Sequence, residues 1–332
     1  MIEIAEIVKE NPARIVEWAN AITYNDNISS EDRDISAEMD AWAKNLGRTG
    51  HDRDHEISQM ITNTFTPDAV ELPSELLDRM FDFGSIGEFD DEVIEVAPKN
   101  TLRAYDAAYG GNVDRSFIDT TLLKPTWKHL QIETDISLRD VRRGGFKTVA
   151  NLLTFIDEAF EMKRLATVIE IIDSAITSGA AGYVSETGSA PTETSASALA
   201  TYMTDVADGD QPLMFGMNKY INAISKLSGS TTYLTDAAKD MYRKTGRIDD
   251  YAGCELFGVS GTRKLGDGTL LIPDKRVFGA AGKIGKITMR GDINALQETD
   301  INSEKIHIKV NGYHFGVAIT EPEKVGKIVM AQ

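Results

Sequence analysis

The chain has 332 residues, of which 42% are hydrophobic and 26% charged, so it is long enough for one large or two medium domains with an apolar core. Its 52 acidic and 35 basic residues give a net charge of −17, which disfavours nucleic-acid binding because a polyanion needs clustered Lys and Arg. No run approaches the ~20 apolar residues that cross a bilayer, and residues 1–22 lack the basic start and apolar run of a secretory signal. We therefore expect a cytosolic protein with no membrane partner.

The N-terminal segment, residues 1–62, is polar and patterned for helices. Apolar residues recur near a period of 3.6, first around Trp18 and then around Trp42. So much amphipathic surface in a short segment predicts that it packs on the main body or on a neighbouring subunit. A further short helix is expected from Glu75 to Phe81, with Ser74 near its cap.

Two segments, 92–98 and 127–138, alternate between polar and apolar residues and predict strands. The polar stretch between them, 99–125, has no strong helical period and carries Gly110-Gly111 at its expected tip. A loop of this length is rare inside a compact domain, so we predict an extended arm that projects from the body. Such an arm has too little core to be stable alone and would be ordered by lying on a partner.

The clearest helical pattern covers 146–177, directly after Gly144-Gly145, and holds one apolar face with no internal Gly or Pro. At 1.5 Å per residue such a helix would reach about 45 Å, which we interpret as a spine.

The remaining chain mixes helices and strands. A helix is expected over 191–206, a strand over 212–216, and then a helix that ends at Ser228-Gly229. The last hundred residues hold short strand-like segments punctuated by Gly and Asp: FGVSG, GDGTLLIP, KIGKITMRG, KIHIKVNG and YHFGVAI. The fold class predicted from this order is α+β.

The residues that most resemble a metal or thiol site do not fulfil its requirements. His51 and His55 are spaced to share a helix face, but H-E-x-x-H needs Glu where Asp52 stands, so a solvated helix face is favoured. Cys254 is the only cysteine, which excludes a disulfide within the chain. A buried, inert thiol is favoured over a catalytic one.

Two glycine motifs also fail. FGVSG (257–261) lacks the spacing of G-x-S-x-G. GAAGKIGKI (279–287) has Ala280 and Ile287 where a P-loop needs Gly and Ser or Thr, so it is interpreted as a glycine-rich turn between strands.

Isolated polar residues complete the search for chemistry. Asp90-Asp91 is interpreted as an acidic loop before a strand. Three histidines without a patterned carboxylate partner are interpreted as polar positions on strand faces: His129, His307 and His314. We assign no catalytic residue, no cofactor-binding residue and no metal ligand, and expect no cofactor.

The order of parts resembles the major capsid proteins of tailed bacteriophages, which have the Hong Kong 97-type fold. Segments that are similar to such capsid sequences are 78–91, 99–119, 125–148 and 310–329. The resemblance implies five parts: an N-terminal arm (1–84), an extended loop (85–136), a peripheral domain with the spine helix (137–184), an axial domain (185–300), and C-terminal strands that return to the peripheral domain (301–332).

The function implied by this resemblance is structural. Copies would form the pentamers and hexamers of an icosahedral shell, assembled in the host cytoplasm, that encloses double-stranded DNA without reading its sequence. A container need not grip its cargo, so the acidic charge is compatible. The expected partners are further copies of the chain, a separate scaffold, the portal and cement proteins.

Residues expected at contacts between subunits fall into two groups. Apolar contacts of the extended loop and its root are assigned to Tyr105, Tyr109, Phe117 and Trp127. Pairing with acidic neighbours across a junction is assigned to Arg139, Arg142 and Arg143, with simple solvation as an equally supported alternative.

Two other functions stay open at this point. An encapsulin-type compartment shares the fold but houses enzymes rather than a genome. A metal-dependent hydrolase would belong to a different class and would use the region of His51 and His55.

Overall fold

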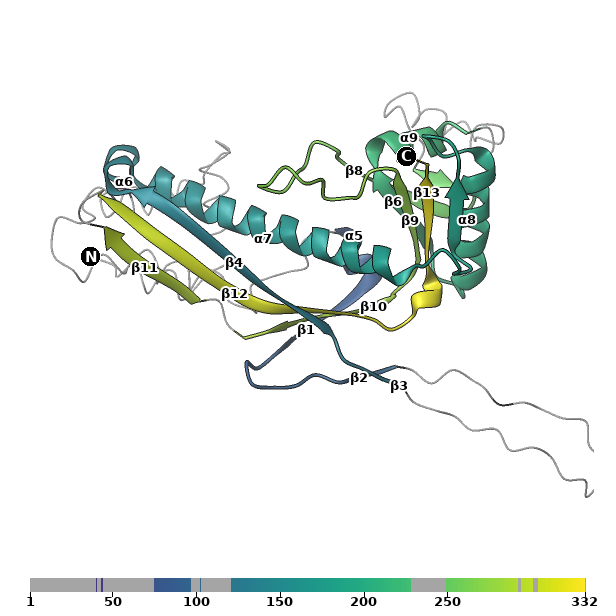
Figure 1. Cartoon of the computed structure of the whole chain (residues 1–332), viewed down its shortest axis with the longest axis horizontal. Helices are drawn as coiled ribbons and strands as arrows, with labels where there is room; N and C mark the ends of the chain where they lie inside the picture. The colour runs from purple at the N-terminus through teal and green to yellow at the C-terminus, as the bar shows by residue number, and fades with distance from the viewer. Residues whose placement is uncertain are drawn as a thin grey trace, which may run out of the picture.

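The computed structural model describes residues 40, 43, 75–96, 102, 121–227, 249–291, 294–300 and 304–331. These residues form two large β-sheets joined by one long helix, and a separate two-stranded sheet (Figure 1). The helices predicted within 1–62 lie outside this part of the chain, except that Asp40 and Ala43 are both helical.

The long helix, α7, spans Phe146–Ala175 and confirms the predicted spine. Its 30 residues correspond to about 45 Å at 1.5 Å per residue. It contacts strands β4 (Thr126–Ser137) and β12 (Lys305–Ile319). Apolar side chains on this side, including Val149 and Ile156, are almost fully buried. Burial of apolar surface contributes roughly 25 cal/mol per Å², and this free energy stabilises the packing of the helix on the sheet.

A five-stranded sheet underlies α7 and has the order β1–β10–β12–β11, with β4 on the other side of β12. Only β1 and β10 pair in parallel; the other pairs are antiparallel. The remaining bounds are β1 (Phe81–Ile86), β10 (Gly285–Arg290) and β11 (Asn294–Asp300). The alternation predicted for β4 is confirmed, since Leu130 and Ile136 are buried while Gln131 and Glu133 are exposed.

Strand β12 is longer than the sequence suggests. The two segments KIHIKVNG and YHFGVAI, expected to be separate, form one strand of 15 residues. The register shifts between Asn311 and His314, so a bulge absorbs the irregularity without ending the ladder. Glycine is required there because a Cβ on Gly312 would lie 2.6 Å from the backbone oxygen of Leu130.

A six-stranded sheet forms the other body, in the order β5–β13–β9–β6–β8–β7. The bounds are β5 (Tyr183–Glu186), β6 (Pro212–Met217), β7 (Asp250–Tyr251), β8 (Cys254–Val259), β9 (Arg276–Ala281) and β13 (Val325–Met330). The strand predicted at 212–216 is confirmed as β6. The segment GDGTLLIP is not a strand; it is a turn closed by one bridge between Lys264 and Leu270.

Two helices pack on this sheet. Helix α8 (Glu193–Val206) contacts β13, β9 and β5, and α9 (Asn218–Ser225) contacts β8 and β6. Thr192 and Ser195 form a capping box at the start of α8, which satisfies backbone N–H groups that a helix end leaves free. Both predicted helices are present, and α9 ends at Ser225, before the predicted end at Ser228-Gly229.

The chain crosses from one sheet to the other three times, first through α7, which leads from β4 to β5. Strand β9 leads into β10 through Gly282, which has φ of 71°, so a glycine-rich turn does join two strands as predicted. Strand β12 leads into β13 through the short 3-10 helix η3 (Pro322–Lys324). Neither of the segments 185–300 and 301–332 therefore belongs to a single sheet. In the first, β10 and β11 lie in the five-stranded sheet, and in the second, β13 lies in the six-stranded sheet.

Four further short elements precede α7 in the chain. Helix α5 (Glu75–Met80) confirms the predicted helix and buries Leu76, Leu77 and Met80. Strands β2 (Ile94–Val96) and β3 (Thr121–Leu123) form a separate two-stranded hairpin. Helix α6 (Leu138–Gly144) links β4 to α7, and Ser137 caps its N-terminus by accepting a bond from the N–H of Asp140.

Candidate intersubunit surface

The β2–β3 hairpin and the turn before it carry exposed apolar side chains. Its strands pair with each other only, at Ile94–Leu123, Glu95–Leu122 and Val96–Thr121. Around it, Val93 is 47% exposed, Leu122 65% and Phe89 94%. A two-stranded hairpin is marginally stable in water unless it packs on something else. The surface is therefore apolar, as a protein–protein contact would be, and the described residues of the subunit do not cover it.

The turn that carries Phe89 is fixed to the five-stranded sheet by charge pairs. Lys286 on β10 binds the largely buried Glu92 at 2.6 Å, and Arg290 lies 3.6 Å from Asp91. The acidic loop predicted at Asp90-Asp91 is thus confirmed. Since both ends of the turn are held by the sheet, Phe89 projects from a defined position.

Trp127 lies where β4 leaves the hairpin and is half-buried. The guanidinium of Arg290 lies 4.8 Å from the centre of its ring, a cation–π distance. Gly316 is directly opposite on β12, and a Cβ there would lie 2.8 Å from the indole. Trp127 therefore packs within the subunit, and a contact with a neighbour stays a prediction. The other apolar residues assigned to this surface lie outside the described residues: Tyr105, Tyr109 and Phe117.

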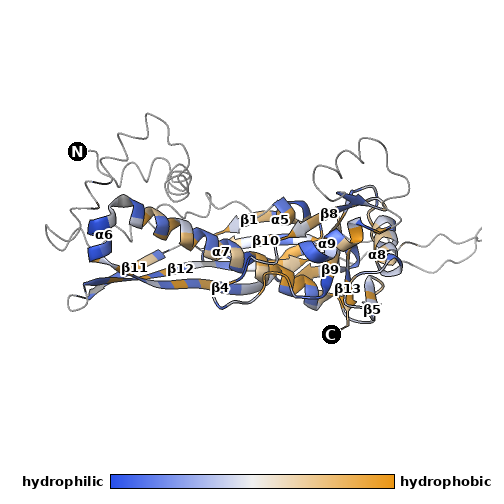
Figure 2. Cartoon of the chain, turned by 90° about the horizontal axis from the view of Figure 1, so that it is seen from above, coloured by the Kyte–Doolittle hydropathy of each residue, from blue (hydrophilic) through white to orange (hydrophobic). Residues whose placement is uncertain are grey.

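The predicted arginines lie on α6, at the end of α7 that is farther from the six-stranded sheet (Figure 1). Arg139 and Arg143 are exposed and Arg142 is partly exposed. The hydropathy view shows this helix as predominantly hydrophilic (Figure 2). Arg142 and Arg143 lie in its last turn, where a positive charge interacts favourably with the helix dipole. Their pairing with a neighbouring subunit stays a prediction.

The opposite end of α7 is tied to the six-stranded sheet by a carboxylate. Asp173 binds Arg276 of β9, and it accepts a bond from Lys327 of β13 at 2.9 Å. Burial, followed by the charge of Arg276, lowers the pKa of the Lys327 ammonium. This contact fixes the spine to the second body.

The strand histidines are more connected than the sequence indicates. His307 Nδ1 lies 2.5 Å from Asp135 Oδ1, so the expectation that it lacks a carboxylate partner is wrong. The register places Asp135 directly opposite it, 172 residues away in the chain. His129 stacks on His314 with ring centres 4.6 Å apart. Burial, followed by the charges of His129 and Arg290, lowers the pKa of His314.

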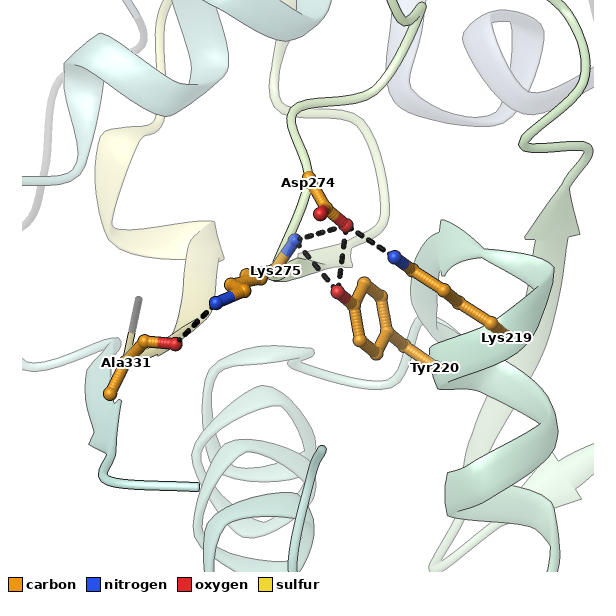
Figure 3. Close-up of polar contacts among 5 residues, drawn as sticks. All are labelled: Lys219, Tyr220, Asp274, Lys275 and Ala331. Atoms are coloured by element: carbon orange, nitrogen blue, oxygen red, sulfur yellow. Dashed lines mark hydrogen bonds and ion pairs between the residues drawn. The ribbon is translucent and has the colours of Figure 1, made fainter. Parts of the chain in front are cut away.

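A polar cluster joins α9 to the end of β13 (Figure 3). Asp274 Oδ1 accepts bonds from Lys219 Nζ at 2.5 Å and from the Tyr220 hydroxyl at 2.7 Å. These two bonds lower the pKa of Asp274. Lys275 Nζ donates to the carbonyl of Ala331 at 3.0 Å. The groups satisfy one another and connect elements, which is a structural arrangement.

Among the described residues, the remaining candidates do not form a catalytic or metal-binding site. Cys254 is fully buried, as predicted, and burial raises the pKa of its thiol to about 11. The hydroxyl of the partly exposed Ser260 lies 2.7 Å from that of Thr262. His51 and His55 lie outside the described residues. In the part of the chain that the structure describes, no cluster of three or more His, Cys, Asp or Glu could hold a metal, and no helix is long and apolar enough to span a membrane.

Comparison with known proteins identifies the family. The family described as "SPbeta prophage-derived putative capsid protein YonB" matches residues 14–329. No curated protein matches the chain. Among solved structures, the capsid of a native GTA particle is 11% identical with a TM-score of 0.58, and the match covers 79% of this chain and 92% of that chain.

Two phage structures give similar values. The capsid of the cyanophage P-SCSP1u is 11% identical with a TM-score of 0.51, with 77% of this chain and 88% of that chain covered. The structure from Microbacterium phage Oxtober96 is 10% identical with a TM-score of 0.51, with 75% of this chain and 89% of that chain covered.

At these identities the solved structures show the fold, which is the α+β, Hong Kong 97-type capsid fold that the resemblance implies. The family match spans nearly the whole chain and points to a structural protein of the phage shell rather than to an enzyme. The chain therefore belongs to the YonB family of phage capsid proteins, and it is a structural component of the virion capsid.

Proposed function

We propose that this chain is the major capsid protein of a tailed double-stranded DNA phage. Its copies form the pentamers and hexamers of an icosahedral shell that is assembled in the host cytoplasm and encloses the genome. The observation that carries the proposal is the apolar surface at the β2–β3 hairpin. Leu122 on β3, Val93 just before β2 and Phe89 in the preceding turn are exposed, and β2 and β3 pair only with each other. Neighbouring copies would cover this apolar surface.

The parts of the proposed subunit follow the two sheets. The peripheral domain would comprise α7 and the five-stranded sheet, and the axial domain would comprise the six-stranded sheet with α8 and α9. Residues 1–84 would be the arm and 85–136 the extended loop. The tie between Asp173 and the six-stranded sheet supports motion of the spine and the axial domain as one body.

The proposed contacts between subunits are apolar at the loop and ionic at α6. Tyr105, Tyr109, Phe117 and Trp127 would contact a neighbour, together with Phe89. Obligate interfaces bury roughly 2,000 to 5,000 Å², which can outweigh repulsion between acidic subunits that salt screens over about 8 Å.

At α6, Arg139, Arg142 and Arg143 would pair with acidic residues of the neighbour. Arg143→Glu should then reduce assembly, measured by sedimentation. Lys226→Glu is the matched control, because Lys226 is also exposed but lies at the end of α9. Equal assembly of the two variants would show that the α6 arginines are solvated and do not pair with a neighbour.

A separate scaffold, a portal and cement proteins are proposed as further partners. Electron microscopy of the purified chain, alone and with its scaffold, tests the central proposal; rings or shells are expected. A strictly monomeric species across concentration and salt, with scaffold present, would contradict it.

Deletion of 100–124 provides a second test. It should leave a soluble fold but abolish shells, because the five- and six-stranded sheets lie outside the deleted segment, whereas most of the extended loop, including β3, is lost. Normal icosahedral particles from this variant would show that the extended loop is not required for assembly.

A further inference from the structure

The N-terminus of α7 lacks a cap of its own. Its N-cap residue is Gly145, which has φ of 65° and makes no side-chain hydrogen bond. The first turn contains no acidic residue and includes the exposed Lys147. A helix of 30 residues has free N–H groups and a partial positive charge at this end, so it favours a carboxylate there.

A carboxylate from far along the chain lies at this position. The side chain of Asp40 is directly against Gly145, and its Cγ lies 3.1 Å from the point that a Cβ on Gly145 would occupy. Residue 145 could not carry a capping side chain itself, for two reasons. Its positive φ favours glycine, and Asp40 fills the space.

The same segment is also held by apolar contact. Ala43 is three residues further along the chain and, like Asp40, is helical. It is fully buried in the apolar core that also contains Val141 and Val149 from either side of the α6–α7 junction. Ala43 is fully buried and Asp40 lies against Gly145, so both residues contact the rest of the fold.

We propose that Asp40 is the N-cap of α7, supplied by the N-terminal segment, and that it fastens this segment to the spine. The carboxylate would accept hydrogen bonds from free N–H groups of the first turn and offset the positive end of the helix. The contact lies within one subunit, so it goes beyond the proposed shell function and does not depend on it.

Hydrogen exchange of the amides of residues 146–149, measured on the full-length unassembled chain, tests the proposal. Asp40→Ala should accelerate exchange about 2- to 30-fold, the range expected for loss of an N-cap side chain. Asp40→Asn should accelerate it less, about 2- to 5-fold, because Asn caps well but carries no charge. The control Asp140→Asn removes a nearby charge in the first turn of α6 and should leave these amides unchanged.

The double variant Asp40→Ala, Gly145→Ala provides an independent measurement. If both residues serve one contact, the loss of unfolding free energy in the double variant should be smaller than the sum of the single losses. Exchange in Asp40→Ala equal to that of Asp140→Asn, or strictly additive losses, would overturn the proposal. Where Asp40→Ala does not fold, the comparison of Asp40→Asn with Asp140→Asn decides in the same way.

Discussion

Strand β6 and the β2–β3 hairpin are both short and rich in apolar residues, yet they end in opposite environments. All six residues of β6 are buried, because the strand lies inside the six-stranded sheet and contacts both α8 and α9. In the hairpin, Leu122 is 65% exposed and each strand has a single partner. One region completes its apolar contacts within the subunit, whereas the other leaves apolar side chains exposed among the described residues.

The largest expected effect on the free energy of unfolding comes from a substitution in β6. Phe215 on β6 is fully buried and stacks on Phe278 at 5.3 Å between ring centres. Phe215→Ala should lower the free energy of unfolding by about 3–5 kcal/mol through lost burial and a cavity. Chemical denaturation of the unassembled chain measures it. Phe89→Ala removes the same side chain from the exposed turn, and a similar loss there would contradict the comparison.

The tie between α7 and the six-stranded sheet should rank second. Asp173→Ala leaves Lys327 buried without its carboxylate, and Arg276 loses the same partner. Breaking a fully buried pair costs ~3–5 kcal/mol, and the partial exposure of Arg276 reduces this to about 2–4 kcal/mol. Asp82→Ala is the control, because its pair with Lys283 at 3.5 Å is exposed and should contribute less than about 1 kcal/mol. Equal losses of stability in a urea titration would refute the structural role of Asp173.

A pH-dependent effect is expected where the hairpin joins the sheet. The pKa of His314 is lowered in the folded chain by burial and by the nearby charges of His129 and Arg290, while Glu88 acts in the opposite direction. The unfolded chain thus binds more protons, so this group's contribution to stability is present above the ordinary His pKa of ~6.5 and is lost as the pH falls through the folded pKa.

His314→Gln removes this group and tests the sign. Between about pH 7 and pH 5, the melting temperature of the wild type should fall more steeply than that of His314→Gln. The effect should be smaller than that of Asp173→Ala, because one partly buried ring is involved. Parallel pH profiles of the two proteins would show that His314 does not contribute.

The smallest effect on the free energy of unfolding is expected at the β2–β3 hairpin and the turn before it. Phe89→Ser combined with Leu122→Ser should change the free energy of unfolding by less than about 0.5 kcal/mol, because exposed side chains contribute little. Assembly should nevertheless be strongly weakened, since apolar anchors dominate interface energies. Leu296→Ser is the matched control. Leu296 is 53% exposed and lies on β11, which pairs with the edge of β12 opposite to β4. Unimpaired shells from the double variant, seen by electron microscopy, would separate the hairpin from assembly.

Elements with a long, regular pattern could be predicted from the sequence. The period of α7 and the alternation of β4 are local properties, so their bounds follow closely from the residues. Strand β12 was expected as two pieces because a bulge at Gly312 interrupts its alternation. The pairing of His307 with Asp135 could not be predicted, because it depends on the register between strands far apart in the chain.

The candidate surface shows the same division. Phe89 and Leu122 are ordinary apolar residues in the sequence, and only their exposure distinguishes them from Phe215. Trp127 could be predicted as a residue of the loop root, but its contacts with Arg290 and Gly316 required the register of β4 and β12. The assigned arginines are exposed at Arg139 and Arg143, as a surface role needs.

By itself, the sequence determined the spine helix, the alternating strand before it, the inert cysteine and the lack of a recognisable catalytic motif. These follow from composition and from spacings of two to four residues, which the backbone converts directly into local structure. The tertiary structure decided which sheet receives each strand, that β13 leaves its predecessor to join β9, and that Asp40 lies against Gly145. Such contacts join residues that are distant in the chain, and the burial and hydrogen bonding of the whole fold select them.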